Sequence, residues 1–121
     1  MSADRRQYPS NEILSLVREF LAKLSQEVHL RAAFLFGSSV TGERTSESDV
    51  DLVVVADEFE GMRLSERFRI VYRHWPLEKY SADIFPLGPL EFERKKTRSI
   101  ILRDASQYWI RVYPFETESS Q

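Results

Sequence analysis

Two aspartates, Asp49 and Asp51, stand at the start of an apolar run and are well suited to carry chemistry. Side chains of a strand alternate between its two faces, so carboxylates two positions apart point the same way. Residues 52–56, Leu-Val-Val-Val-Ala, are continuously apolar, which is typical of a strand covered on both faces. Charges beside such an interior are costly unless they are paired or bind a cation. The two carboxylates are therefore candidate ligands of Mg²⁺, although a loop cap at Asp49 and a solvated strand end at Asp51 would also account for the pattern.

A Gly-Ser pair, Gly37-Ser38, precedes the aspartates by ten residues and follows another apolar run. Glycine lets a backbone approach a ligand closely, and the free N–H groups of a helix start, with the Ser38 hydroxyl, can bind phosphate oxygens. Taken alone, the pair is more typical of an ordinary turn.

A third carboxylate, Asp83, interrupts the apolar run Ser-Ala-Asp-Ile-Phe over residues 81–85. If this strand lies beside the strand of residues 50–56, the three carboxylates converge. Asp83 can then ligate a metal ion and accept the proton of an attacking hydroxyl.

The elements that must position these residues follow from the spacing of apolar side chains. Intervals of three and four predict helices, and alternation or continuous apolar runs predict strands. Residues 37–48 are predicted to be a loop, or a short helix followed by a loop, and Pro86 is predicted to end the third strand. The first predicted helix follows a cap at residues 9–11 and carries apolar residues from Ile13 to Leu24, and the other predicted helices cover residues 64–75 and 90 to about 104. The predicted strands cover residues 29–36, 50–56, 80–85 and 107–113.

Length and composition limit the class of protein. A chain of 121 residues fits a single domain over residues 1–121, and residues 1–8 and 115–121 are expected to be disordered tails. With 42% hydrophobic residues the chain can build one core, and its net charge of −2 makes nucleic acid an unlikely direct partner. The absence of cysteine excludes disulfides, thiolate zinc sites and cysteine nucleophiles. No apolar run is long enough to span a bilayer, so no membrane partner and a cytoplasmic location are expected.

Other charged and aromatic residues have more ordinary explanations. The arginines of the second predicted helix, Arg67 among them, are interpreted as a solvated face, with an acidic or RNA-bound partner as the alternative. Trp75 and Trp109 are interpreted as core or interface residues. Trp109 and Tyr113 share the exposed face of the last predicted strand, which makes a docking surface there an open alternative.

Gly37-Ser38, ten further residues, Asp49-Val50-Asp51 and the later Asp83 together resemble the signature of the DNA polymerase β-like nucleotidyltransferase superfamily. The short length and the run Asp-Ile-Phe-Pro-Leu-Gly-Pro-Leu-Glu-Phe-Glu-Arg from Asp83 look like its minimal nucleotidyltransferases, the MNT proteins. These are often the antitoxins of HEPN/MNT toxin–antitoxin pairs. The resemblance covers roughly residues 30–94 and implies an α/β (α+β) nucleotidyltransferase fold, with a small mixed sheet of about four strands flanked by helices.

The resemblance also implies an activity, the Mg²⁺-dependent transfer of AMP from ATP with release of pyrophosphate. Asp49 and Asp51 would hold two Mg²⁺ ions, and Asp83 would complete the catalytic metal site. The acceptor would be a tyrosine hydroxyl of a partner HEPN toxin, with which the chain would form a hetero-oligomer. The implied nucleotide-binding residues are Gly37, Ser38, Ser39, Gly42 and Arg44.

One departure bears on the nucleotide site. Many relatives carry Ala-Arg-Gly where this chain has Val40-Thr41-Gly42, with Arg44 two residues beyond. Loss of that cation could weaken triphosphate binding, or Arg44 could replace it. Two alternatives follow: an antitoxin with a vestigial pocket that neutralises by binding, and transfer to a small molecule or RNA, which normally needs an additional domain.

Overall fold

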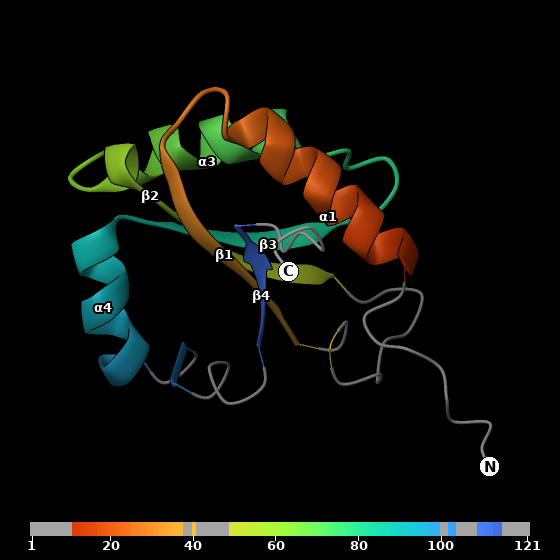
Figure 1. The fold of residues 1–121 in the computed structure, drawn as a ribbon. Helices are drawn as coiled ribbons and strands as arrows, with labels where there is room; N and C mark the ends of the chain where they lie inside the picture. Colours follow the sequence, from red (N-terminus) through yellow and green to blue (C-terminus); the bar gives the residue numbers. More distant parts are fainter. Residues whose placement is uncertain (1–10, 38–39, 41–48, 100–101, 104–108, 115–121) are drawn as a thin grey trace, which may run out of the picture.

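A computed structural model describes residues 11–37, 40, 49–99, 102–103 and 109–114. In this part of the chain a four-stranded mixed sheet is flanked by helices (Figure 1), as predicted. No helix among these described residues is both long and apolar enough to cross a membrane. The elements in chain order are α1 (Asn11–Leu24), β1 (Leu30–Phe36), β2 (Val50–Ala56), the 3-10 helix η2 (Asp57–Phe59), α3 (Leu64–Arg73), β3 (Ala82–Leu87), α4 (Pro89–Arg98) and β4 (Ile110–Tyr113).

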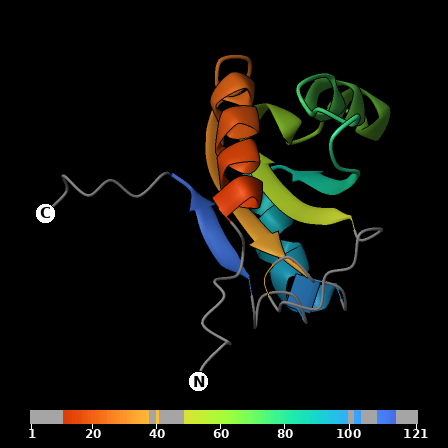
Figure 2. The same ribbon diagram turned by 90° about the vertical axis from the view of Figure 1, so that its right-hand side faces the viewer.

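The strand order is β3-β2-β1-β4, which leaves β3 and β4 at the two edges (Figure 2). β1 is antiparallel to both of its neighbours, whereas β2 and β3 are parallel. Parallel neighbours need a crossover connection, and α3 lies within the segment that joins them. The parallel pair starts both strands at the same end of the sheet, so residues that enter β2 and β3 become neighbours.

The sheet separates two apolar cores. Val50, Leu52 and Val54 of β2 are buried in the core beneath α1 and α3, while Val53 and Val55 are buried in the core beneath α4. This alternation explains the continuous apolar run of β2, because both of its faces are covered. The prediction of a doubly buried strand is thereby confirmed.

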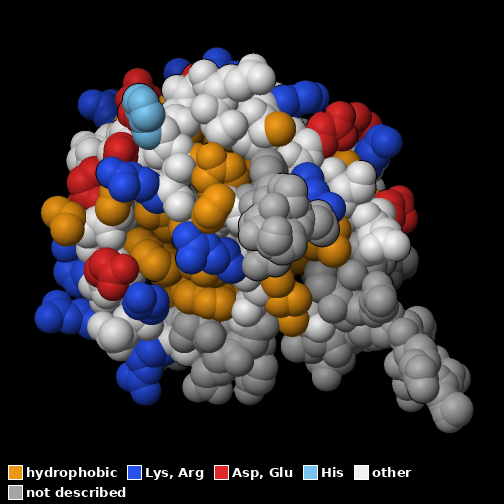
Figure 3. Space-filling model, viewed as in Figure 1, with side chains coloured by type: hydrophobic (Ala, Val, Ile, Leu, Met, Phe, Trp, Pro, Cys, Tyr) orange, Lys and Arg blue, Asp and Glu red, His pale blue; other side chains and the backbone are white. Residues whose placement is uncertain are grey.

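The α4 core is built mainly from aromatic rings. Phe34 of β1 stacks against Trp109 with ring centroids 4.3 Å apart and against Phe92 of α4 at 5.5 Å. Figure 3 shows hydrophobic side chains gathered on this side of the molecule, with Lys and Arg side chains among them. The interpretation of Trp109 as a core or interface residue is confirmed, since its ring packs in this stack rather than standing clear of the sheet.

Several predicted boundaries were wrong. β3 runs through Pro86 to Leu87, because the peptide unit of Pro86 faces the outer edge of the sheet, where a missing N–H breaks no ladder bond. α4 was predicted to reach residue 104 but ends at Arg98, because Ser99 takes an extended conformation. α3 ends at Arg73, two residues before the predicted end. Within the described residues the last strand begins at Ile110, and residues 107–108 of its predicted range lie outside them.

Candidate active site

Asp51 and Asp83 are direct neighbours in the parallel pair of β2 and β3. The Cα of Asp51 is the register partner of the Cα of Asp83. Both side chains start on the sheet face that carries α4, because Val53 and Phe85, two positions further along, pack in the α4 core. Neighbouring strands lie about 4.8 Å apart, so the two carboxylates begin side by side. The expectation that the strand of Asp83 lies beside the strand of Asp51 is confirmed.

Asp49 stands one step outside β2 and is tied to the start of β3. The hydroxyl of Ser81 donates a hydrogen bond to Asp49 Oδ1, and the N–H of Val50 donates to the Ser81 carbonyl oxygen at 2.9 Å. Asp49 and Asp51 are two positions apart, so the strand pattern directs them to the same face. The start of the parallel pair thus carries all three predicted carboxylates.

Gly37 brings the end of β1 against the carboxylate of Asp51. It directly follows Phe36, the register partner of Asp51, and its φ of +77° lies in the left-handed region that favours glycine. A Cβ at this position would overlap Asp51 Oδ2 and lie 3.1 Å from Asp51 Cγ. The glycine is therefore required both by its dihedral angle and by the space that Asp51 occupies.

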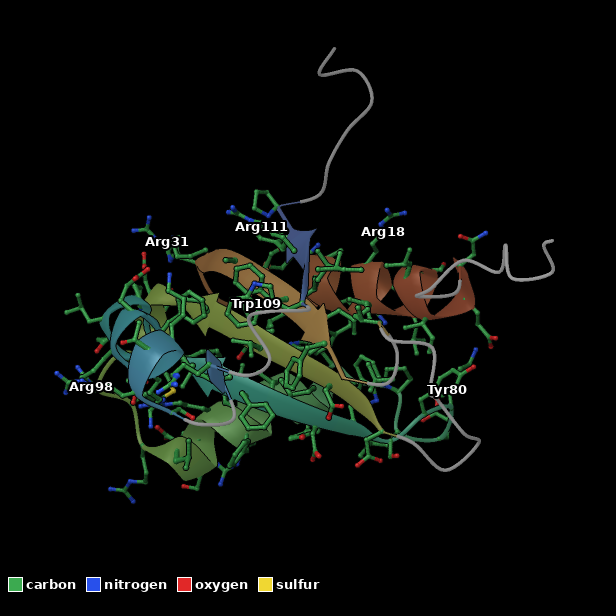
Figure 4. The ribbon with its side chains drawn as sticks, turned by 90° about the horizontal axis from the view of Figure 1, so that it is seen from below. Arg18, Arg31, Tyr80, Arg98, Trp109 and Arg111 are labelled. Atoms are coloured by element: carbon green, nitrogen blue, oxygen red, sulfur yellow. The ribbon has the colours of Figure 1, made fainter. Side chains whose placement is uncertain are left out.

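The remaining predicted nucleotide-binding residues, Ser38, Ser39, Gly42 and Arg44, lie outside the described residues, as does Thr41. Their roles stay predictions. Figure 4 marks the two ends of this face of the sheet: Tyr80, which precedes β3, lies at the end where β2 and β3 begin, and Arg98 of α4 lies toward the other. The carboxylates therefore lie where β2 and β3 begin, at the opposite end of this face from Arg98, and Asp83 is exposed.

Tyr72 of α3 contacts the strand segment that carries Asp83, which the sequence interpretation did not anticipate. Its hydroxyl donates to the Ala82 carbonyl oxygen and accepts the N–H of Ile84, both at 3.0 Å. Burial raises the pKa of Tyr72, the Ile84 N–H lowers it, and the negative charges of Asp83 and Asp49 raise it further, so that the net shift is upward. The hydroxyl therefore remains protonated and available as a donor at neutral pH.

Arg67, interpreted from the sequence as part of a solvated face, is instead buried, with 7% of its side chain exposed. It donates to Glu91 Oε1 at 2.7 Å and to the carbonyl oxygens of Pro86 and Met62 at 3.0 and 2.8 Å. For Arg67 the interpretation was wrong, because a partly buried carboxylate and two carbonyl oxygens replace water around its guanidinium. Its position three residues after Leu64 on the apolar side of α3 was the available signal.

A groove of about 480 Å³ extends along the outer edge of β3, between α3 and α4. Asp83 lines it at the start of β3, and Lys95 of α4 lines it as well. The wall of the groove is mainly apolar and includes Leu64 and Phe68 of α3, which are 52% and 38% exposed. The groove therefore connects an exposed apolar surface with one of the candidate catalytic carboxylates.

The carboxylates suit a magnesium ion that is bound together with phosphates. Within the described ranges, no three His, Cys, Asp or Glu side chains are grouped closely enough to hold a metal ion by themselves. Magnesium, however, is commonly bound by one or two carboxylates while substrate phosphates and water complete its octahedron. Asp51 and Asp83 on adjacent strands match that donor set, and Asp49 lies one residue before β2.

Comparisons with known proteins identify the family and the fold. Residues 14–108 match the family model described as nucleotidyltransferase domain. A candidate nucleotidyltransferase from Sulfolobus solfataricus shares the fold, with a TM-score of 0.55 and 24% identity over 69% of this chain and 73% of that chain. No curated protein sequence gives a significant match.

Two toxin–antitoxin structures also share the fold. One, solved with AMP-PNP, has a TM-score of 0.55 and 17% identity over 84% of this chain and 74% of that chain. The other, a mutant of the MntA-HpeT toxin–antitoxin, has a TM-score of 0.51 and 17% identity over 91% of this chain and 75% of that chain. At these identities the likeness concerns the fold.

Proposed function

Because this chain belongs to the nucleotidyltransferase domain family, we propose that it transfers AMP from ATP to a tyrosine hydroxyl of a partner HEPN toxin, and thereby acts as an antitoxin. The observation that carries the proposal is the parallel register that sets Asp51 beside Asp83, with Gly37 packed against Asp51. This arrangement sets two carboxylates side by side at one end of the sheet, where they could hold the metal ions that phosphoryl transfer uses.

In the proposed reaction the acceptor oxygen attacks the α-phosphorus of ATP. The bond from that phosphorus to the oxygen bridging to the β-phosphorus breaks, and pyrophosphate leaves with the bond electrons. Asp83 accepts the proton of the attacking hydroxyl. Asp49, Asp51 and Asp83 would hold two Mg²⁺ ions, whose chemistry is to neutralise charge on the phosphates and to orient them.

The segment after β1 would hold the triphosphate. Gly37 places its backbone against Asp51, so phosphates held by the following residues would lie beside the carboxylates. The proposed phosphate-binding residues after this glycine are Ser38, Ser39, Gly42 and Arg44. Arg44 supplies the positive charge that Thr41 does not.

The acceptor would reach Asp83 through the groove between α3 and α4. Its largely apolar walls, with Leu64 and Phe68 exposed, suit the ring of a tyrosine and its apolar neighbours in a protein partner. Two proteins with this fold are components of toxin–antitoxin structures, one of which contains AMP-PNP. These features together favour a protein acceptor over a small molecule or RNA.

The direct experiment uses ATP labelled on its α-phosphate, Mg²⁺ and the purified, unmodified product of the gene next to the one encoding this chain. We expect the label on a tyrosine of that product, and Asp51→Asn and Asp83→Asn to reduce labelling at least about a hundredfold. Glu93→Gln, which neutralises an exposed carboxylate of α4 instead, should label normally. Label from the γ-phosphate would indicate a kinase, and the absence of label from either position would refute the proposal.

The alternative of neutralisation by binding alone is supported by the Thr41 departure and by the hydrogen bond that occupies Asp49 Oδ1. Cells that express the toxin distinguish the two modes. If Asp51→Asn still protects them at wild-type protein levels, occlusion is sufficient. If protection is lost while the variant still binds the toxin, catalysis is required.

A further inference from the structure

β3 is an edge strand, and its outer side faces α3 instead of a further strand. Residues 82, 84 and 86 direct their peptide groups outward, where side chains of α3 meet them. Arg67 donates to the Pro86 carbonyl oxygen, and the Tyr72 hydroxyl contacts both Ala82 and Ile84. Tyr72 thus bonds the residues immediately before and after Asp83.

We infer that Tyr72 is a positioning residue for Asp83: its hydroxyl fixes the backbone on both sides of the carboxylate and so sets where that carboxylate stands relative to Asp51. The inference rests on the proposed nucleotidyl transfer and adds a residue to it. Tyr72 also lines the groove proposed for the acceptor, but no step of the scheme uses its hydroxyl, which is bonded to the backbone on both sides of Asp83; it is therefore a positioning residue.

The geometry explains why a single hydroxyl can have this effect. On its inner side, β3 is held by the parallel ladder to β2, in which Asp51 and Asp83 are register partners. On its outer side, the described contacts of residues 82 and 84 with α3 side chains run through the Tyr72 oxygen, which donates one bond and accepts the other. Without it, the Ala82 carbonyl oxygen and the Ile84 N–H lose their partner, and the strand can shift just where Asp83 projects. Displacement of a reacting group by about 1 Å can reduce a rate about a hundredfold.

Tyr72→Phe removes this oxygen and keeps the ring. We expect kcat for AMP transfer to fall on the order of 10- to 100-fold, the KM for ATP to stay within about twofold, and half-maximal rate to need more Mg²⁺. Amide hydrogen exchange, which is independent of activity, should be faster at Ile84. In an Asp83→Asn background, Tyr72→Phe should lower the residual rate no further, because there is no carboxylate left to position.

Trp75→Phe is the matched control. Trp75 lies just after α3, and its Nε1–H donates to the Tyr80 carbonyl oxygen at 2.7 Å, so the variant also loses one side-chain bond to the backbone near β3. It should lower stability without a comparable loss of kcat. Equal losses in both variants at matched folded fractions, or a full additional loss in the Asp83→Asn background, would overturn the positioning role. If wild-type protein transfers no AMP but Ile84 exchange still responds to Tyr72→Phe, the proposed function fails, and the two hydrogen bonds of the Tyr72 hydroxyl are purely structural.

Discussion

Replacement of Gly37 by alanine separates two effects that the structure combines at one residue, backbone strain and contact with Asp51. Gly37 and Gly61 have nearly identical left-handed φ angles, +77° and +80°, but an added Cβ overlaps Asp51 Oδ2 at the first position and meets nothing within 4 Å at the second. Gly61→Ala therefore reports strain alone. An L residue in this region costs about 1–2 kcal/mol, and the reduced entropy of the unfolded chain returns about 0.4–1 kcal/mol.

We expect Gly61→Ala to lower the free energy of unfolding by about 1 kcal/mol and to leave AMP transfer unchanged. Gly37→Ala should lose at least as much stability, and transfer should fall on the order of a hundredfold because Asp51 must move. Urea denaturation gives the stability of both variants, and labelling under conditions in which both are folded gives their activity. If the two variants transfer AMP equally well, the contact between Gly37 and Asp51 has no role in the site.

Three further predictions concern packing and charge. Arg67→Met should lower the free energy of unfolding by about 3 kcal/mol, because it leaves Glu91 without its buried partner; urea denaturation should show recovery in the double variant with Glu91→Leu, and no recovery would argue against the pairing. Burial raises the pKa of Glu91, but hydrogen bonds from Arg67 and from the Gly88 N–H outweigh it and hold the pKa below its ordinary value of 4.5. Stability from this pair is therefore present above pH 4.5 and lost as the pH falls through the lower folded value, so denaturation midpoints of Glu91→Gln should depend less on pH below 4.5. Trp109→Ala should lower the free energy of unfolding by about 2 kcal/mol through loss of its stack on Phe34. Arg111→Ala, in the adjoining strand β4, is the control in the same denaturation series and should change stability by less than about 0.5 kcal/mol.

The carboxylates could be found from the sequence because their signal is local. Asp51 precedes an unbroken apolar run, and Asp83 interrupts one, and both patterns arise from the burial of the strands themselves. The sequence did not predict that the strands carrying Asp51 and Asp83 are parallel neighbours, and their pairing could only be assumed. Strand order and direction depend on the crossover through α3, which no local pattern encodes.

Contacts between residues far apart in the sequence were also missed, because they too depend on how the elements are arranged in the fold. Arg67 meets Glu91 across 24 positions of sequence, and Tyr72 meets Ile84 across 12. An arginine on a helix is usually solvated, and only the fold supplies the carboxylate and carbonyl oxygens that make its burial favourable. Pro86 was misread because a proline normally ends a strand, whereas at a sheet edge it is tolerated.

The hydrogen bonds from α3 to the outer side of β3 also bear on self-association. An uncovered edge strand offers unpaired N–H and carbonyl groups to the sheet of another molecule. On this edge, Tyr72 already bonds the Ala82 carbonyl oxygen and the Ile84 N–H, and Arg67 bonds the Pro86 carbonyl oxygen. These two side chains therefore compete with a second sheet for the outer edge of β3, and variants that lose both are expected to precipitate more readily than equally unstable variants altered elsewhere in α3.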